Sequence, residues 1–246
     1  MIEPSCDITQ KTLDRAKEFY STHRELPGID TSFKYFIDHP IAKLNRKRLA
    51  LIVDKTRKVA DVTKLHALDV ACGGGILTLA LNLAGLETLG VDLDQQEINL
   101  ANTFFADAKA KGQFAALNVF SENWKTEVET LLKGKPRVVL LAYALHHLKE
   151  VEKFVADLSS WLDPGSVLII NEENPRSPTF KLKHFVRSII QRDTDIEYHR
   201  SYNAWRSLLE KNGFTVSKPT GADVMPYLAT LCPVCCWSIV FTAKKT

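Results

Sequence analysis

A short apolar segment that runs into a glycine-rich loop constrains this fold more than any other feature. Residues 66–71, His-Ala-Leu-Asp-Val-Ala, favour a buried strand, Gly73-Gly-Gly75 interrupts it, and residues 76–83 favour a helix. Further strands are predicted at 88–93, 114–119, 137–144, 167–170, 214–218 and 236–243. Helical patterns separate most of these strands, and this alternation predicts a doubly wound α/β fold: a parallel sheet with helices on both faces.

Composition agrees with one globular domain. The chain has 246 residues, of which 45% are hydrophobic and 25% charged, so a packed core is expected and disorder is not. A net charge of +3 is too small to argue for a nucleic-acid partner. The best apolar run, Val138 to Leu145, is far shorter than the ~20 residues that span a bilayer. No secretory signal is visible and the five cysteines are odd in number, which predicts a cytoplasmic protein.

The glycine-rich loop, together with Asp92 nineteen residues after Gly73, predicts a nucleotide-type cofactor. Glycines let backbone N–H groups approach a ligand at a helix N-terminus, and Asp92, at the end of the second strand, can accept hydrogen bonds from ribose hydroxyls. A dinucleotide fingerprint needs G-x-G-x-x-G, but its third glycine position is Thr78 here. The pattern acid-x-G-x-G-x-G fits better. Asp94 with Glu97 forms a capping-box pattern for the next helix.

With Asp69, Gly73 and Gly75 in that pattern, the chain resembles the class I S-adenosylmethionine-dependent methyltransferases, with Ala71 at their first glycine position. Three later segments extend the resemblance over about residues 60 to 243: Leu141-Ala-Tyr-Ala-Leu-His-His-Leu148, Asp163-Pro-Gly-Ser-Val-Leu-Ile-Ile170 and Leu208-Leu-Glu-Lys-Asn-Gly-Phe214. The resemblance implies a Rossmann-like, seven-stranded sheet whose last strand is antiparallel. N-terminal helices and a helical insertion after the fifth strand complete the expected fold.

The same resemblance implies roles for individual residues in binding S-adenosyl-L-methionine. Asp69, Ala71, Gly73 and Gly75 would shape the pocket for the methionine part. Asp92 would hold the ribose and Leu93 would pack on the adenine. The remaining predicted contacts are Asn118 and Val119 at the end of the third strand, and Ala142 and Tyr143 near the end of the fourth. No metal site is predicted, because the C-x-x-C of Cys232 and Cys235 has no second ligand pair.

Methyl transfer from a sulfonium is an in-line displacement, so a base matters only when the acceptor is a hydroxyl or a weakly acidic carbon. His146, His147 and Glu172 are the predicted candidates for a catalytic base. The alternative for His147 is a buried, hydrogen-bonded structural histidine. Glu173 competes with Glu172 for the direction toward the ligand, since adjacent strand residues face opposite sides.

The predicted function is transfer of a methyl group to an oxygen, nitrogen or carbon atom of a small molecule. Alternatives are an RNA or protein methyltransferase that uses the basic helices, and a non-catalytic S-adenosylmethionine-binding module. The expected organisation is one methyltransferase domain: a helical cap (1–60), a cofactor-binding core (61–173), a helical lid (174–200) and a C-terminal helix with strands (201–246). Two points stay open: whether the basic helix 180–191 contacts a membrane surface, and whether the acceptor is lipophilic or aromatic. The acceptor and the oligomeric state are not determined by the sequence.

Overall fold

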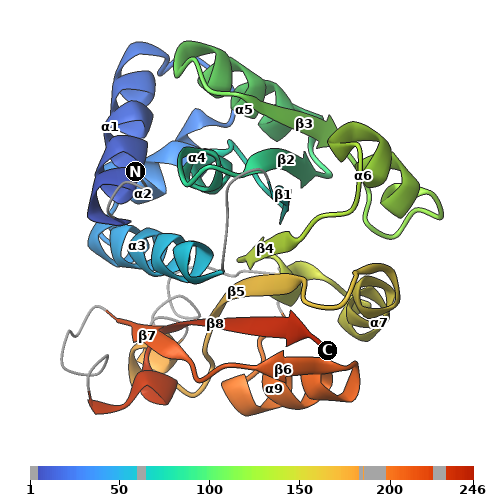
Figure 1. Cartoon of the computed structure of the whole chain (residues 1–246). Coiled ribbons are helices and arrows are strands. Elements are labelled where there is room, and N and C mark those ends of the chain that lie inside the picture. Colours follow the sequence, from blue (N-terminus) through green and yellow to red (C-terminus); the bar gives the residue numbers. More distant parts are fainter. Residues whose placement is uncertain (1–4, 60–64, 183–184, 186–197, 224–230) are drawn as a thin grey trace. The chain divides into compact units, whose positions relative to one another are not determined.

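The computed structural model describes residues 5–59, 65–182, 185, 198–223 and 231–246 (Figure 1). The chain divides into two compact units, Met1–Leu140 and Leu141–Thr246. One strand, β4 (Val138–Ala142), runs from the first unit into the second. The organisation into a cap, a core and a lid within one methyltransferase domain stays a prediction.

The first unit begins with helices. They are α1 (Ser5–Thr22), the short π-helical η1 (Asp30–Lys34), α2 (Tyr35–Ile37) and α3 (Ala42–Lys58). In α3 the buried side chains include Leu44, Leu49 and Ile52, which recur at helical spacing and form one apolar stripe. Figure 1 shows α1 packed beside α3 and α4.

The rest of the first unit alternates strands and helices as the sequence predicts. After β1 (His66–Val70) come α4 (Ile76–Leu83), β2 (Glu87–Asp92), α5 (Gln95–Asp107), β3 (Gly112–Ala116) and α6 (Trp124–Leu132). β2 pairs in parallel with β1 and with β3, so the carboxyl ends of these strands lie at one edge of the sheet. The residues that follow β1, β2 and β3 are thereby brought to a common edge.

Two local predictions in this unit need correction. Asp94 is the N-cap of α5 and accepts from the N–H of Gln96, but Glu97 does not complete a capping box; its carboxylate binds Ser32 instead. The third strand was expected at 114–119 and lies at Gly112–Ala116. It ends earlier because the Asn118 side chain accepts from the N–H of Phe120 and turns the chain.

The second unit contains the remaining elements. They are η2 (Leu145–His147), α7 (Val151–Trp161), β5 (Val167–Glu173), α9 (Tyr202–Lys211), β6 (Phe214–Val216), β7 (Thr220–Ala222), η3 (Pro233–Cys235) and β8 (Ser238–Lys245). Ser201 caps α9 by accepting from the N–H of Ala204, and Trp205 is buried, as its place in the apolar stripe predicts.

The strands follow the order β3-β2-β1-β4-β5-β8-β6, with β7 pairing β8 off this path. The final strand, β8, runs antiparallel to β5, β6 and β7. The predicted α/β sheet with an antiparallel last strand is therefore confirmed. The short β7 was not predicted, because three residues carry too little periodicity to be recognised.

The structure describes the predicted inserted helix only in part. Residues 178–182 and residue 185 are helical, whereas 183–184 and 186–191 of the predicted basic helix lie outside the described residues. Leu182 and Phe185 are 60% and 63% exposed. Phe180 is buried instead, beside Thr179, whose hydroxyl donates to Asp223 at 2.8 Å. This hydrogen bond joins the segment after β5 to the residue that follows β7.

Cys232 and Cys235 form a disulfide bond across η3, while Cys6, Cys72 and Cys236 are not disulfide-bonded. Within the described ranges, His, Cys, Asp and Glu side chains do not gather into a group that could hold a metal ion. A search of the same residues finds no helix with both the length and the apolar character that crossing a bilayer requires.

Candidate functional site

The loop between β1 and α4 has an unusual backbone. Gly73 and Gly75 adopt left-handed φ angles of 48° and 83°, which glycine tolerates without strain. Ala71 adopts φ 57° as well, and there its Cβ crowds the following carbonyl oxygen. Ala71 stands at the position where the resembling family has glycine, so the structure gives a conformational reason for that preference.

Replacing Ala71 with glycine is therefore expected to stabilise the fold by about 0.5–1 kcal/mol, since relief of the left-handed strain outweighs the extra freedom of the unfolded chain. Urea unfolding measures the change. The matched control is Ala156→Gly on the exposed side of α7, in the interior of that helix, which should destabilise by about 1 kcal/mol. A destabilised Ala71→Gly variant would contradict the strain.

Asp92, at the end of β2, ties this loop to the next one. Its Oδ2 accepts from the N–H of Gly73 at 2.9 Å and its Oδ1 from the N–H of Asp94 at 3.0 Å. Each carboxylate oxygen keeps a second lone pair, so the partly exposed side chain can still accept from a ligand hydroxyl. The next residue, Leu93, is 74% exposed, which is unusual for leucine and offers an apolar surface to a flat ring.

Asp69 lies inside the wall of the site and not at its surface. Its side chain is buried, and the Thr78 hydroxyl donates to Oδ2 at 2.6 Å. Burial raises the pKa of Asp69 to about 7, and the nearby charge of Asp92 adds to this rise. Thr78, the residue that breaks the dinucleotide fingerprint, is therefore the partner of the first acid of the motif.

Two residues that the sequence analysis missed, Ser32 and Glu97, meet at the glycine loop. The Ser32 hydroxyl donates to Glu97 Oε2 and accepts from the N–H of Gly74 at 3.2 Å. A Cβ on Gly74 would come within 2.8 Å of the Phe33 ring, so only glycine fits under this segment. Burial raises the pKa of Glu97. No local pattern predicts this contact, because Ser32 is 42 residues from Gly74 and 65 from Glu97.

The remaining predicted residues of the first unit follow β3. Asn118 is exposed and its Oδ1 already accepts from the N–H of Phe120 at 2.9 Å. Val119 is buried. Both follow the end of β3, while Asp92 ends β2 and Leu93 follows it, so the parallel register brings these four residues to the carboxyl edge of the sheet.

In the second unit, His146 and Glu172 form a buried pair. His146 Nδ1 lies 2.5 Å from Glu172 Oε2, and Glu172 Oε1 accepts from the N–H of Leu145 at 2.8 Å. His146 is 5% exposed and Glu172 is fully buried. Two further imidazoles surround the pair: the ring centroids of His147 and His199 lie 4.1 and 4.8 Å from that of His146. This arrangement fixes one nitrogen of the His146 ring against a carboxylate.

The structure distinguishes His146 from His147, and Glu172 from Glu173. The alternative that His147 is the buried, hydrogen-bonded histidine is wrong, because His147 is exposed and His146 is buried. Glu173 points elsewhere: its Oε1 accepts from the indole N–H of Trp237 at 2.9 Å. The alternation of side chains along β5 explains why only Glu172 reaches His146.

Ala142 ends β4 and Tyr143 follows it, and both residues belong to the second unit. Ala142 is buried, and Tyr143 is half-buried with a left-handed φ of 58°. The N–H of Tyr143 donates to the carbonyl of Asn171 at 2.9 Å. A tyrosine held at positive φ is a strained position of the kind that gathers at functional sites.

Known proteins resemble this chain in sequence and in fold. The ubiquinone biosynthesis O-methyltransferase of Rickettsia felis is 27% identical over 142 residues, which cover 57% of this chain and 54% of the relative. The ubiquinone biosynthesis O-methyltransferase of Bordetella avium is 26% identical over 200 residues, which cover 80% of this chain and 76% of the relative. The chain thus spans about half the length of several such relatives.

Two solved structures share the fold. Magnesium protoporphyrin IX methyltransferase of Synechocystis, crystallised with S-adenosylhomocysteine, has a TM-score of 0.67 and 17% identity, covering 94% of this chain and 98% of its own. The N-methyltransferase NodS of Bradyrhizobium japonicum has a TM-score of 0.62 and 14% identity, covering 93% and 98%. A family model described as a methyltransferase domain matches residues 38–218. The glycine loop, the acid after β2, the sheet order and this match lead to one conclusion: the chain belongs to the methyltransferase domain family.

Proposed function

We propose that this protein transfers a methyl group from S-adenosyl-L-methionine to a hydroxyl group of a small molecule. The observation that carries the choice of a hydroxyl is the buried pair of His146 and Glu172. A hydroxyl must lose its proton as it is methylated, whereas a neutral amine attacks without prior deprotonation. The sequence relatives are also named as O-methyltransferases.

The carboxyl edge of the first unit fits the cofactor. Asp92 has spare lone pairs for the two ribose hydroxyls, and exposed Leu93 offers its side chain to the adenine ring. The loop of Ala71, Gly73 and Gly75 would surround the methionine part. Asn118 and Val119 complete the predicted adenine contacts, and Ala142 and Tyr143 those near the sulfur. When bound, S-adenosylmethionine supplies a methyl group on a sulfonium, whose sulfur leaves as a neutral thioether and needs no acid.

His146 is the proposed base and Glu172 its positioning residue. Glu172 would hold the proton on Nδ1, so that Nε2 is the nitrogen that would accept the proton of the acceptor hydroxyl. The negative carboxylate also stabilises the imidazolium that forms. His147, although exposed, remains a second candidate that a variant can test.

The acceptor we propose is apolar or aromatic. Leu182 and Phe185, in the segment after β5, are both more than half exposed, and the relatives' name refers to a quinone. A cytoplasmic location rests on the sequence alone and stays a prediction.

The Asp92→Ala variant tests the ribose contact. S-adenosylhomocysteine should bind about 1–3 kcal/mol more weakly, because the ribose hydroxyls lose a charged acceptor and the N–H of Gly73 loses its partner. Calorimetric titration measures the affinity. Asp107→Asn, on an exposed end of α5, is the control and should bind normally. Unchanged affinity in Asp92→Ala would rule out the ribose assignment.

The reaction itself is tested with labelled S-adenosylmethionine and matched acceptors: catechol-type compounds with apolar side chains, and the corresponding anilines. We expect label in the hydroxylated acceptors only. Transfer to the anilines alone would contradict the role of His146. Binding of S-adenosylhomocysteine without transfer to any acceptor would favour the non-catalytic module, and transfer to RNA or protein would favour the macromolecular alternative.

A further inference from the structure

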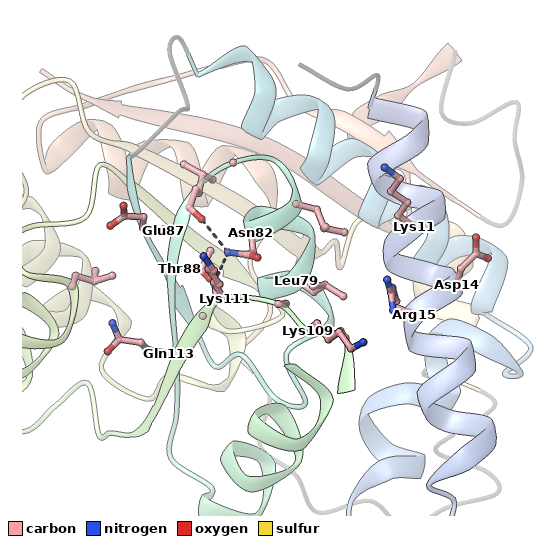
Figure 2. Close-up of a pocket in the computed structure, with 17 residues that line it drawn as sticks. Lys11, Asp14, Arg15, Leu79, Asn82, Glu87, Thr88, Lys109, Lys111 and Gln113 are labelled. Carbon is pink, nitrogen blue, oxygen red and sulfur yellow. Dashed lines mark hydrogen bonds between the residues drawn. The ribbon is translucent and has the colours of Figure 1, made fainter. Parts of the chain in front are cut away.

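A cleft of about 980 Å³ lies in the first unit, away from the glycine loop (Figure 2). Its walls come from α1, from the end of α4 and from the turn between α5 and β3. Glu87 and Thr88, the first two residues of β2, line the cleft. Asp92 ends the same strand and lies about 16 Å from Glu87, at ~3.3 Å per residue. The cleft therefore opens at the amino edge of the strands, opposite the candidate cofactor site.

The charges around the cleft are mostly positive. Lys11 and Arg15 project from α1, and Lys109 and Lys111 lie in the turn after α5 (Figure 2). The two lining acids are already engaged: Asp14 accepts from the Gln10 amide at 2.7 Å, and Glu87 lies 3.2 Å from His66 Nε2. Among the described residues, no carboxylate lies within ion-pair distance of Arg15, Lys109 or Lys111. Asp14 and Glu87 keep their negative charge in these contacts, so four cations against two acids leave the rim of the cleft with a net positive charge.

A buried hydroxyl lies in the same lining. The side chain of Thr88 is 4% exposed, and its Oγ1 has no hydrogen-bond partner among the described atoms. Thr88 pairs with Gly112, which follows Lys111, and a Cβ on Gly112 would lie 3.0 Å from that oxygen. A buried polar group without a partner costs free energy, and a ligand oxygen could relieve it.

The floor between the charged walls is apolar. Leu79 and Leu83 of α4 and Ala108 and Ala110 after α5 line it. Its volume lies near the upper end of the ~300–1,000 Å³ typical of small-molecule sites. We propose that this cleft binds a small anionic amphiphile, whose carboxylate or phosphate meets Lys109, Lys111 and the Thr88 hydroxyl while its apolar part covers the α4 leucines.

Calorimetric titration of the full chain with dodecyl phosphate, below its critical micelle concentration, tests the proposal. We expect one molecule to bind per chain, with at least about tenfold weaker binding of dodecyl maltoside, which lacks the charge, and of inorganic phosphate, which lacks the apolar part. Dodecanoate should bind like dodecyl phosphate. Saturating S-adenosylhomocysteine should leave the affinity unchanged, because the cofactor edge is remote.

Variants locate the site. Thr88→Val should weaken dodecyl phosphate binding about tenfold without lowering the unfolding temperature, since the hydroxyl it removes has no partner in the free protein. The double variant Lys109→Gln with Lys111→Gln should weaken it at least fivefold. The matched control, Lys17→Gln with Lys43→Gln, changes two exposed lysines outside the cleft and should bind normally.

Three results would overturn the proposal. The first is equal affinity for dodecyl maltoside, because the charged rim would then play no part. The second is unchanged affinity in both Thr88→Val and the cleft lysine variant, which would place the ligand elsewhere. The third is binding to anionic vesicles without binding of the monomer, which would assign the positive charge to a membrane surface.

Discussion

Replacement of His146 with asparagine is expected to lower the rate of methyl transfer to a hydroxylated acceptor by about 10²- to 10⁴-fold, the range that a positioned general base contributes. Asparagine cannot take up the acceptor proton at neutral pH, although its amide can still donate to Glu172. Formation of S-adenosylhomocysteine under single-turnover conditions measures the rate, and its unchanged affinity would show that the cofactor site is intact.

Two further variants separate the base from its surroundings. Glu172→Gln should cost less than His146→Asn, because the amide oxygen can still accept from Nδ1 but no longer stabilises a positive ring. It should also shift the acidic limb of the pH–rate profile to lower pH, which a purely structural role would not do. His147→Asn, on the exposed neighbour, is the matched control. Full activity in His146→Asn, with loss in His147→Asn, would transfer the base role to His147.

The second large effect concerns stability and pH. The buried Asp69 has its pKa raised to about 7, whereas an unfolded chain has the ordinary aspartate value near 4. Below about pH 4 both states hold the proton. Between about pH 4 and 7 the folded protein retains it and the unfolded chain does not, so this group's contribution to stability is lost as the pH rises through that window. The loss is on the order of 4 kcal/mol.

Asp69→Asn should remove this dependence. The amide oxygen can accept from the Thr78 hydroxyl, as the protonated acid does, but it cannot ionise. Relative to the native protein, the variant should therefore gain stability from pH 4.5 to about pH 7 in urea unfolding, and the difference should level off above that pH. The exposed Asp107→Asn serves as the control and should follow the native curve. Parallel curves for Asp69→Asn and the native protein would mean that Asp69 is already ionised in the folded state at neutral pH.

Local sequence signals predicted those parts of the fold in which neighbouring residues determine the structure. The helix 76–83 was placed at its observed bounds because Gly75 ends the loop and an apolar run follows. The contact of Thr179 with Asp223 after β5 was not predicted, because the two residues are 44 positions apart.

The candidate site shows the same division. The sequence by itself determined the alternating strands, the glycine loop, Asp92 at its fixed distance from that loop, and the family, because each depends on spacing along the chain. Only the tertiary structure decided which histidine is buried against Glu172, that Ser32 joins the glycine loop, and that Thr88 lacks a partner in a cationic cleft. The contacts of His146 and Ser32 depend on side-chain direction and join residues that are 26 to 65 positions apart in the sequence. Local periodicity carries no information about such contacts.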